Sequence, residues 1–421
     1  MRREPDIAVV GAGMVGAATA ALLARMSPGT SIAVLDAEAP PRWRADDEVG
    51  LRVSALSEAS RRVLAACGAW DEIAAGRISP YAHMRVWDGA IPAGGPGAIR
   101  FSAADVAAPV LGHIVENELV RLALRNVLLR LDNISMLDGA RLETLVLEGE
   151  RAELGIEDGR RLQARLVVGA DGAGSPSRSM AGLEVQGHDY EQRAVVCILR
   201  CQLPHAETAW QRFLPEGPIA LLPLADGRVS IVWSTTPENA AALLAADDET
   251  FRAAVAKAAD GCLGEVLEAG PRAAFPLRMR HAPVYTRARY ALVGDAAHTV
   301  HPLAGQGVNL GFLDAAALAE TVAAGLAAGR DPGDPALLRR YERWRKPENV
   351  IAMRAFDGIN RLFSNDDAAL GAIRRAGFTL VDRLAPLKGI FIRRAMGVEG
   401  DLPEVARPAG PGLRRFQHGE S

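Results

Sequence analysis

The spacing of hydrophobic residues changes twice within the first forty positions. Residues 7–10 (IAVV) are a continuous β-branched run, residues 14–26 are rich in alanine and leucine, and residues 31–35 (SIAVL) are again β-branched. β-branched runs favour strands, whereas alanine and leucine favour helices. The pattern predicts a strand, a glycine turn, a helix and a second strand, which is the βαβ unit that opens many α/β domains.

The same segment resembles a membrane span in hydropathy. Residues 7–24 carry no charge, and about 18 apolar residues is the usual lower limit for a transmembrane helix. Three glycines interrupt the run, which begins close to Met1 and shows no signal-peptide cleavage pattern. We therefore expect a soluble protein, without a membrane helix or a signal peptide here.

Helical and strand periods alternate along the next part of the chain. Residues 116–130 repeat apolar side chains every three to four positions, which is typical of an amphipathic helix. A second helix is expected at 57–67, with Glu58 in its first turn. Residues 88–98 are rich in glycine and proline, which indicates a loop. Short strands are expected at 141–148, 151–156 and 161–168.

From residue 190 the pattern is mostly that of strands. Strands are expected at 195–201, 219–224, 229–234 and 290–293, and helices at 238–268, 311–328 and in segments up to about 396. This order predicts an α/β protein: a Rossmann-like domain of the glutathione-reductase type, interrupted by a β-rich substrate domain and followed by a helical C-terminal part. The expected bounds are 1–75, 100–182 and 276–340 for the first domain, 76–99 and 183–275 for the second, 341–400 for the helical part and 401–421 for a tail.

Composition narrows the class of protein. The chain has 421 residues with 48 basic and 51 acidic side chains, and a net charge of −3 offers no basic surface for nucleic acid. The four cysteines are too few for a disulfide framework and form no CxxC pair, so we expect buried thiols in a reducing cytosol.

A glycine motif lies at the first turn. Gly11, Ala12, Gly13 and Gly16 form GxGxxG between the expected strand and helix, the arrangement that lets a pyrophosphate approach the backbone at a helix N-terminus. Asp36 ends the next strand, 20 residues after Gly16. A carboxylate there can accept hydrogen bonds from a ribose diol. The pattern predicts NAD or FAD.

Two later turns favour FAD. Residues 166–178 (LVVGADGAGSPSR) and 290–311 (YALVGDAAHTVHPLAGQGVNLG) each take a strand into glycine and aspartate. An acid at the end of a strand can hold a ribityl hydroxyl. The amides near Gly305 and Gly307, beside a helix N-terminus, suit the negative charge of a reduced flavin.

These three turns, in this order, resemble the class A flavoprotein aromatic hydroxylases of the para-hydroxybenzoate hydroxylase type. The stretch GDAAHxxHPLAGQGxNxG is similar to the ubiquinone-biosynthesis branch. LSEASRRVL after Arg52, YEQRAVV, RYERWRKPENVIAM and RRAMG extend the resemblance to about residue 400. The resemblance implies that FAD is contacted by Gly11, Ala12, Gly13, Gly16, Asp36, Arg52, Asn117, Asp171, Gly172, Gly294, Asp295, Pro302, Gly305, Gly307 and Asn309.

Several of these residues have ordinary alternatives. Arg52 can be a solvated surface arginine, and Asn117 can cap the helix that follows it. His298 and His301 are expected to be structural or to line a pocket, because no third metal ligand is placed near them. Phe213, Leu222, Pro223 and Trp233 in the β-rich part are expected to be core residues more than substrate contacts.

The resemblance also implies the reaction. NAD(P)H binds transiently and reduces FAD, and a flavin C4a-hydroperoxide formed with O₂ hydroxylates the ring of a polyprenylated phenol or benzoquinol in ubiquinone biosynthesis. No residue is identified as a catalytic base. The alternatives are a flavin hydroxylase of soluble phenols, a flavin halogenase, whose WxWxIP signature is absent, and a non-catalytic flavin-binding scaffold in a biosynthetic assembly.

A lipid substrate implies access from a membrane. Residues 371–397 place Arg374, Arg375, Arg383, Lys388, Arg393 and Arg394 among large apolar residues. This segment suits either a surface in peripheral contact with a membrane or a packed helix pair with a solvated basic face. We expect a cytoplasmic protein, with peripheral contact to the inner membrane and to other ubiquinone-biosynthesis proteins as the two open questions of location and partners.

Overall fold

A mainly parallel sheet forms around the first expected strand in the computed structural model, which describes residues 4–93, 95, 98–300, 307–363, 377 and 384–408. Its strands are, in spatial order, β18 (Thr286–Arg287), β19 (Tyr290–Leu292), β12 (Leu166–Gly169), β1 (Ile7–Val10), β2 (Ile32–Asp36) and β8 (Ile134–Asp138). All neighbours are parallel except β18 and β19. Parallel neighbours end at the same edge, so the segments that follow β1, β2, β12 and β19 meet there.

Alanine-rich helices cover this sheet. Helix α1 (Met14–Met26) contacts both α4 (Asn117–Arg130) and α8 (Gly307–Ala327). The same hydrophobic core includes a small antiparallel sheet of β9 (Leu142–Val146), β10 (Ala152–Ile156) and β11 (Arg161–Ala164), beside helix α5 (Pro176–Met180). Small side chains on α1 let the helix and strands approach closely, which the glycine turn requires.

The second large sheet has eight strands. Their order is β20 (His298–Thr299), β17 (Val266–His281), β13 (Gln186–Cys201), β16 (Val229–Thr235), β15 (Gly217–Pro223), β14 (Thr208–Leu214), β5 (His83–Asp88) and β6 (Ile99–Ser102). Helices α6 (Pro237–Ala245) and α7 (Asp248–Ala258) pack on one face. A three-stranded sheet of β3 (Val53–Ser57), β7 (Gly112–Glu116) and β4 (Ile78–Tyr81) contributes to a core on the other face.

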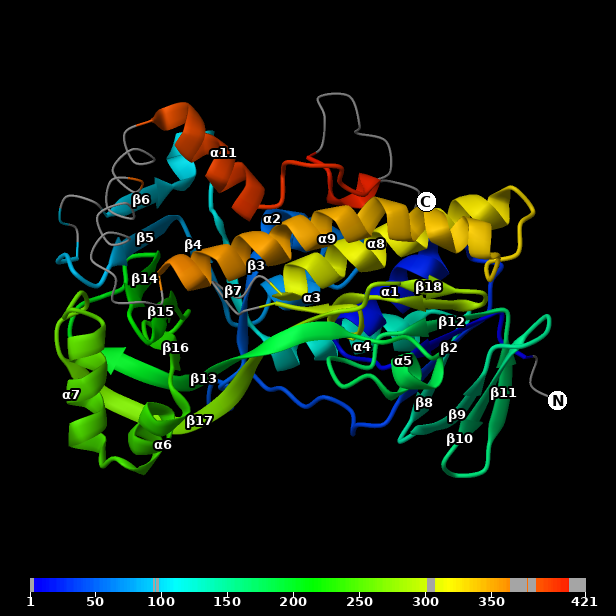
Figure 1. The fold of residues 1–421 in the computed structure, drawn as a ribbon, viewed down its shortest axis with the longest axis horizontal. Helices are drawn as coiled ribbons and strands as arrows, with labels where there is room; N and C mark the ends of the chain where they lie inside the picture. The colour runs from blue at the N-terminus through cyan, green and yellow to red at the C-terminus, as the bar shows by residue number, and fades with distance from the viewer. Residues whose placement is uncertain are drawn as a thin grey trace.

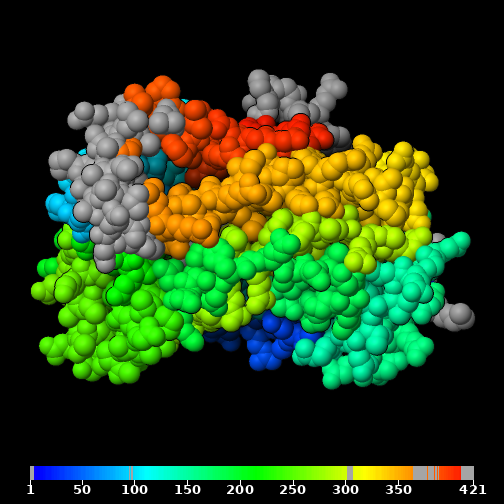
Figure 2. Space-filling view, in the orientation of Figure 1, coloured from blue at the N-terminus to red at the C-terminus, as the bar shows by residue number. Residues whose placement is uncertain are grey.

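One long helix connects the two halves. Helix α9 (Pro335–Phe363) runs beside α8 and reaches the eight-stranded sheet, and Figure 1 shows it crossing nearly the whole width of the molecule. The space-filling view shows it as a ridge above both halves (Figure 2). The shorter helices α2 (Glu58–Cys67), α3 (Trp70–Ala74) and α11 (Ala385–Ala395) complete the described helices of more than one turn.

The expected α/β class is confirmed, as are most elements predicted up to residue 156. Ser57 accepts a hydrogen bond from Ser60 N at the start of α2, as expected for a helix beginning there. The single strand expected at 161–168 is wrong, because the chain bends at Arg165 and its two halves join different sheets. The helix expected at 238–268 is also wrong at its end, since β17 begins at Val266.

The division into domains stays a prediction. Two of its expected bounds fall inside strands: 99/100 lies in β6 and 275/276 lies in β17. The tail beyond residue 408 and most of 364–383 lie outside the described residues.

Helix α8 is the one described helix long and apolar enough in sequence to cross a membrane. Of its most apolar window, 61% is buried inside the protein. It packs against α1, α2 and α9, so its apolar character is that of a core helix.

Candidate cofactor site

The glycines of the first turn have different surroundings. Gly11 has a φ of +100°, and a Cβ there would lie 2.5 Å from Ala170 O. A Cβ on Gly16 would lie 2.0 Å from Gly11 O, whereas one on Gly13 would meet no atom within 4 Å. Gly11 and Gly16 are therefore required by the packing of the turn itself. Gly13 instead faces open space, as a backbone would where a ligand approaches it.

Gly13 is also the residue before the first turn of α1. Its backbone is extended and no side chain caps the helix, so the N–H groups of this turn are available to an anion. Ala12 lies beside them and packs partly against the core. This end of α1 has the charge and the space that a pyrophosphate needs.

Asp36 ends β2 at the same edge of the sheet. Burial raises the pKa of its carboxyl, while a hydrogen bond from Glu38 N and the positive charge of Arg121 lower it. Among the described residues, Glu38 N is the one hydrogen-bond donor to this carboxylate, at 3.2 Å. The carboxylate can therefore accept further hydrogen bonds from a ligand.

The second turn, at Asp171 and Gly172, follows β12. Gly172 has a φ of +84°, and a Cβ there would meet no atom within 4 Å. Asp171 is fully engaged within the protein: it accepts hydrogen bonds from Ser177 N at 2.9 Å and from the hydroxyls of Ser175 and Ser177. The Asp171 carboxylate thus fixes the turn and the start of α5, and the exposed part of the turn is its backbone.

The third turn is a short 3₁₀ helix, Gly294–Ala296, that follows β19. Gly294 has a φ of +59°, and Val293 N donates to Gly169 O, which joins this turn to the second one. The Asp295 side chain is exposed to solvent. The protein around it nevertheless raises the pKa of its carboxyl, and the charges of His298 and Arg52 lower it. Asp295 is therefore an acceptor in a recess beside the first two turns.

Arg178 ties the second and third turns together. It is 5% exposed, and its guanidinium donates to Ala296 O at 2.8 Å and to Ala173 O at 3.2 Å. Burial lowers the pKa of Arg178, and the nearby Asp171 raises it. The sequence pattern assigned this residue no role, although an arginine that closes a glycine-rich turn is a signal for such bridging.

Changing Arg178 to methionine should loosen both turns at once. Two backbone carbonyls would lose their buried donor, at a cost of about 1–3 kcal/mol for each unpaired group. We expect a lower free energy of unfolding and weaker FAD binding, measured by urea denaturation and by flavin fluorescence titration of the apoprotein. Arg287→Met is the matched control, because Arg287 also donates to a backbone carbonyl, that of Gly182, but on the exposed surface. Equal FAD affinity in the two variants would contradict the bridging role.

A buried charged cluster supports the third turn from behind. Asp314 of α8 is fully buried and accepts hydrogen bonds from His298 Nε2 at 2.5 Å, Arg345 Nε at 3.0 Å, Asn349 Nδ2 at 3.0 Å and Gly294 N at 3.2 Å. It thus joins the turn to α8 and α9. The expectation of a structural or pocket-lining histidine agrees with the position of His298.

Three predicted contacts are held by other parts of the protein. Asn309 accepts from Ser57 N and Ser60 Oγ and donates to Ala55 O, so its amide connects α8 to β3 and α2. The Asn117 side chain accepts from Ser54 Oγ and does not cap α4. The Arg52 guanidinium lies 5.0 Å from the centre of the Phe275 ring. Of these three, Arg52 is closest in electrostatic terms to the site, through Asp295.

Part of the predicted site lies outside the described residues: His301, Pro302 and Gly305. Gly307 begins α8, where a Cβ would meet only Val300, at 3.5 Å. No group of three metal-ligating side chains occurs in the described parts of the chain.

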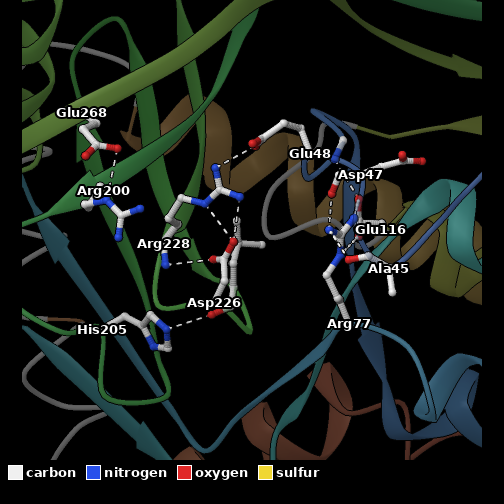
Figure 3. A network of polar contacts seen from close by, with 12 residues as sticks. Ala45, Asp47, Glu48, Arg77, Glu116, Arg200, His205, Asp226, Arg228 and Glu268 are labelled. Atoms are coloured by element: carbon white, nitrogen blue, oxygen red, sulfur yellow. Dashed lines mark hydrogen bonds and ion pairs between the residues drawn. The ribbon is translucent and has the colours of Figure 1, made fainter.

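The segment before Arg52 is held by a carboxylate that the sequence pattern did not single out. Glu116 accepts hydrogen bonds from Trp43 Nε1 at 2.9 Å and from Gly50 N at 2.7 Å, and pairs with Arg77 at 2.9 Å. Arg77 also donates to the carbonyls of Ala45 and Asp47, as Figure 3 shows. The path of residues 43–50, and with it the approach to Arg52, is therefore determined by β7.

The same segment touches the eight-stranded sheet. Arg228, in the turn between β15 and β16, lies between Glu48 at 3.1 Å and Asp226 at 2.7 Å (Figure 3). Glu48 is largely exposed, so this pair adds little stability. It does show that residues 43–50 lie between the two large sheets.

The family of the chain follows from this fold and from sequence comparison. Residues 4–355 match the family described as an FAD binding domain. The folds of solved flavoprotein monooxygenases agree: p-nitrophenol 4-monooxygenase PnpA of Pseudomonas putida (TM-score 0.75, 19% identity, 94% of this chain and 99% of that one) and FAD-bound HpxO of Klebsiella pneumoniae (0.72, 18%, 96% and 100%). The chain is thus an FAD-dependent oxidoreductase with a monooxygenase fold.

Relatives of higher identity narrow the assignment. The chain is 39% identical to ubiquinone hydroxylase UbiL of Rhodospirillum rubrum (96% of this chain, 92% of the relative) and 36% identical to 3-demethoxyubiquinol 3-hydroxylase of Escherichia coli (94% and 100%). It is also 36% identical to the mitochondrial ubiquinone biosynthesis monooxygenase COQ6 of Xenopus tropicalis (91% and 91%). It belongs to the FAD-dependent aromatic hydroxylases, in their ubiquinone-biosynthesis branch.

Proposed function

We propose that the three turns bind a single FAD. The observation that carries this proposal is their convergence at one edge of the parallel sheet, with Gly13 open, α1 uncapped, and the Asp36 and Asp295 carboxylates beside them. The residues proposed to contact FAD are those that the resemblance implies, and the internal hydrogen bonds of Asp171, Asn117 and Asn309 limit these three to shaping the turns.

The protein residues have separate tasks in this proposal. The N-terminus of α1 stabilises the pyrophosphate, Asp36 accepts hydrogen bonds from the ribose, and Asp295 accepts them from the ribityl chain. Bound FAD supplies the redox and oxygen-transfer chemistry. The chain must orient the substrate ring and exclude water, which would otherwise divert reducing equivalents to hydrogen peroxide. NAD(P)H binds transiently as the reductant.

The proposed reaction is hydroxylation of the aromatic ring of a polyprenylated phenol or benzoquinol in ubiquinone biosynthesis, with O₂ as the oxygen donor. The support is the full-length similarity to relatives named for ubiquinone hydroxylation. Some exposed apolar residues suit a lipid substrate delivered from a membrane. Those on or beside α11 are Leu384, Ile390 and Phe391.

Peripheral contact with the inner membrane by a cytoplasmic protein follows from that substrate. The basic residues described on α11 contribute less than their number indicates, because Lys388 pairs with Asp105 and Arg393 pairs with Glu399. Contact would therefore depend mainly on the apolar side chains. The remaining basic residues of the expected surface, Arg374, Arg375 and Arg383, lie outside the described residues.

Deleting the gene in a quinone-producing host tests the proposed reaction. We expect loss of ubiquinone and accumulation of a prenylated precursor that lacks one ring oxygen, identified by mass spectrometry of the lipid extract. Expression of the parent protein should restore ubiquinone. Normal ubiquinone in the deletion strain would refute the proposal, and the position of the missing oxygen would assign the ring carbon.

A further inference from the structure

The two faces of the eight-stranded sheet have different partners. Side chains alternate between faces along a strand. On β16, Val229, Ile231 and Trp233 pack with the core beneath α6 and α7, whereas Val232 packs with Ala55 and Ile114 of β3 and β7. We call the second face the inner face. Trp233 is thus a core residue, as expected, and Leu222 lies on the inner face.

The inner face is directed toward the proposed cofactor site. Phe275 and its register partner Ala194 lie on this face, and the Arg52 guanidinium is 5.0 Å from the centre of the Phe275 ring. The charge of Arg52 acts in turn on Asp295 of the third turn. At the opposite side of the face, the Phe213 ring stacks on Phe363 of α9, with 4.1 Å between ring centres.

Gln211 lies between these two borders. On β14 it stands between Ala209, which packs with the β3 and β7 residues, and Phe213, which packs against α9. Its register partners are Val86 on β5 and Ala220 on β15, and Ala220 is in turn paired with Val232. Gln211 is therefore the one polar side chain in an otherwise apolar row, Val86–Gln211–Ala220–Val232–Val196.

The amide of Gln211 has no hydrogen-bond partner among the described residues, although only 5% of the residue is exposed. An amide carries two donor hydrogens and an acceptor oxygen, and burying them unpaired is unfavourable. Ser230 Oγ on the same face is also unpaired, but it is completely enclosed, whereas the amide atoms of Gln211 are not among the fully enclosed unpaired groups. The Gln211 amide therefore retains access to a ligand.

We propose that Gln211 is a substrate-positioning and specificity-determining residue, whose amide hydrogen-bonds an oxygen substituent of the aromatic ring. This inference rests on the proposed function. The apolar row accommodates the ring, and the single amide determines its rotation, since only the oxygenated edge of the ring can pair with it. A ring without an oxygen at that edge leaves the amide unpaired, and this penalty discriminates against it.

Gln211→Met tests the inference, because methionine has nearly the same length and shape but no hydrogen-bonding amide. The FAD-bound protein is titrated with 2-geranylphenol and with geranylbenzene, and binding is followed by perturbation of the flavin absorbance. We expect the Kd of the phenol to rise about 3- to 10-fold. The Kd of geranylbenzene should stay within about twofold, because it cannot pair with the amide in the parent protein.

Gln192→Met is the matched control. Gln192 is a buried glutamine on β13 of the same sheet, but its amide donates to Glu216 O. This variant should lose stability and keep the preference for the phenol. Gln211→Met should keep or raise the thermal midpoint, since it removes an unpaired buried amide.

Equal changes in the two Kd values, or no change in either, would overturn the assignment of Gln211. Failure of the parent protein to bind 2-geranylphenol while it holds FAD would instead overturn the proposed function, and with it the inference. The share of NAD(P)H oxidation that yields hydroxylated phenol provides a second readout, which should fall in Gln211→Met and not in Gln192→Met.

Discussion

A Gly13→Ala protein should fold as the parent does and bind FAD much more weakly. The φ of Gly13 is −61°, which alanine adopts without strain, and its new Cβ would meet no protein atom within 4 Å. The methyl group would instead occupy the space through which a pyrophosphate approaches the backbone. Overpacking of this kind costs about 1–3 kcal/mol, which corresponds to roughly 5- to 150-fold in affinity.

Gly16→Ala is the informative comparison. Its Cβ would lie 2.0 Å from Gly11 O, a backbone atom that cannot move without opening the turn. This variant should lose several kcal/mol of stability even without cofactor, as severe packing conflicts do. The two are distinguished by urea denaturation of the apoproteins and flavin fluorescence titration. If Gly13→Ala binds FAD as tightly as the parent, the proposed pyrophosphate position is wrong.

Asp314→Ala should produce the largest loss of stability among single substitutions outside the glycine turn. Removing one member of a buried ion pair leaves the others uncompensated, at a cost of about 3–5 kcal/mol. Arg345 and Asn349 would keep their polar groups in the core, and Gly294 N would lose an acceptor. We expect the thermal midpoint of the apoprotein to fall and FAD affinity to weaken with it.

The pH dependence of stability checks the same cluster. Burial by itself would raise the pKa of Asp314, but the charge and hydrogen bond of His298, together with Arg345, hold the pKa below its usual value. A carboxyl whose pKa is lower in the folded state contributes stability above its unfolded pKa of about 4, and loses it as the pH falls through the lower folded value.

The parent protein should therefore lose stability in that acid range more steeply than Asp314→Asn, in which this position does not titrate. Glu48→Gln is a suitable control, since Glu48 is largely exposed and its pair with Arg228 lies at the surface. Parallel acid-denaturation curves for the parent and Asp314→Asn would contradict the role given to Asp314.

Much of the fold could be predicted from local pattern. The opening βαβ unit, α2 with its Ser57 cap, α4, and the eight-stranded sheet's central strands follow from periodicity and capping chemistry. Strand β8 and strands β3 to β5 did not, because their apolar residues are mixed with polar ones and their partners are distant in sequence. The break between β11 and β12 has no glycine or proline signal, and only the different sheets that the two strands join require it.

The candidate site divides in the same way. By itself, the sequence determined the class of cofactor and the glycines and aspartates of the turns, because a close backbone approach and a strand-end carboxylate restrict which residue types can occur there. Tertiary structure decided which of these groups are available: Asp171 and Asn309 are engaged internally, whereas Gly13 and Asp295 are open. It also decided the roles of Arg178, Asp314 and Gln211. Their functions depend on partners, or on the absence of them among the described residues, that come from strands and helices far away in the chain, and no local pattern carries that information.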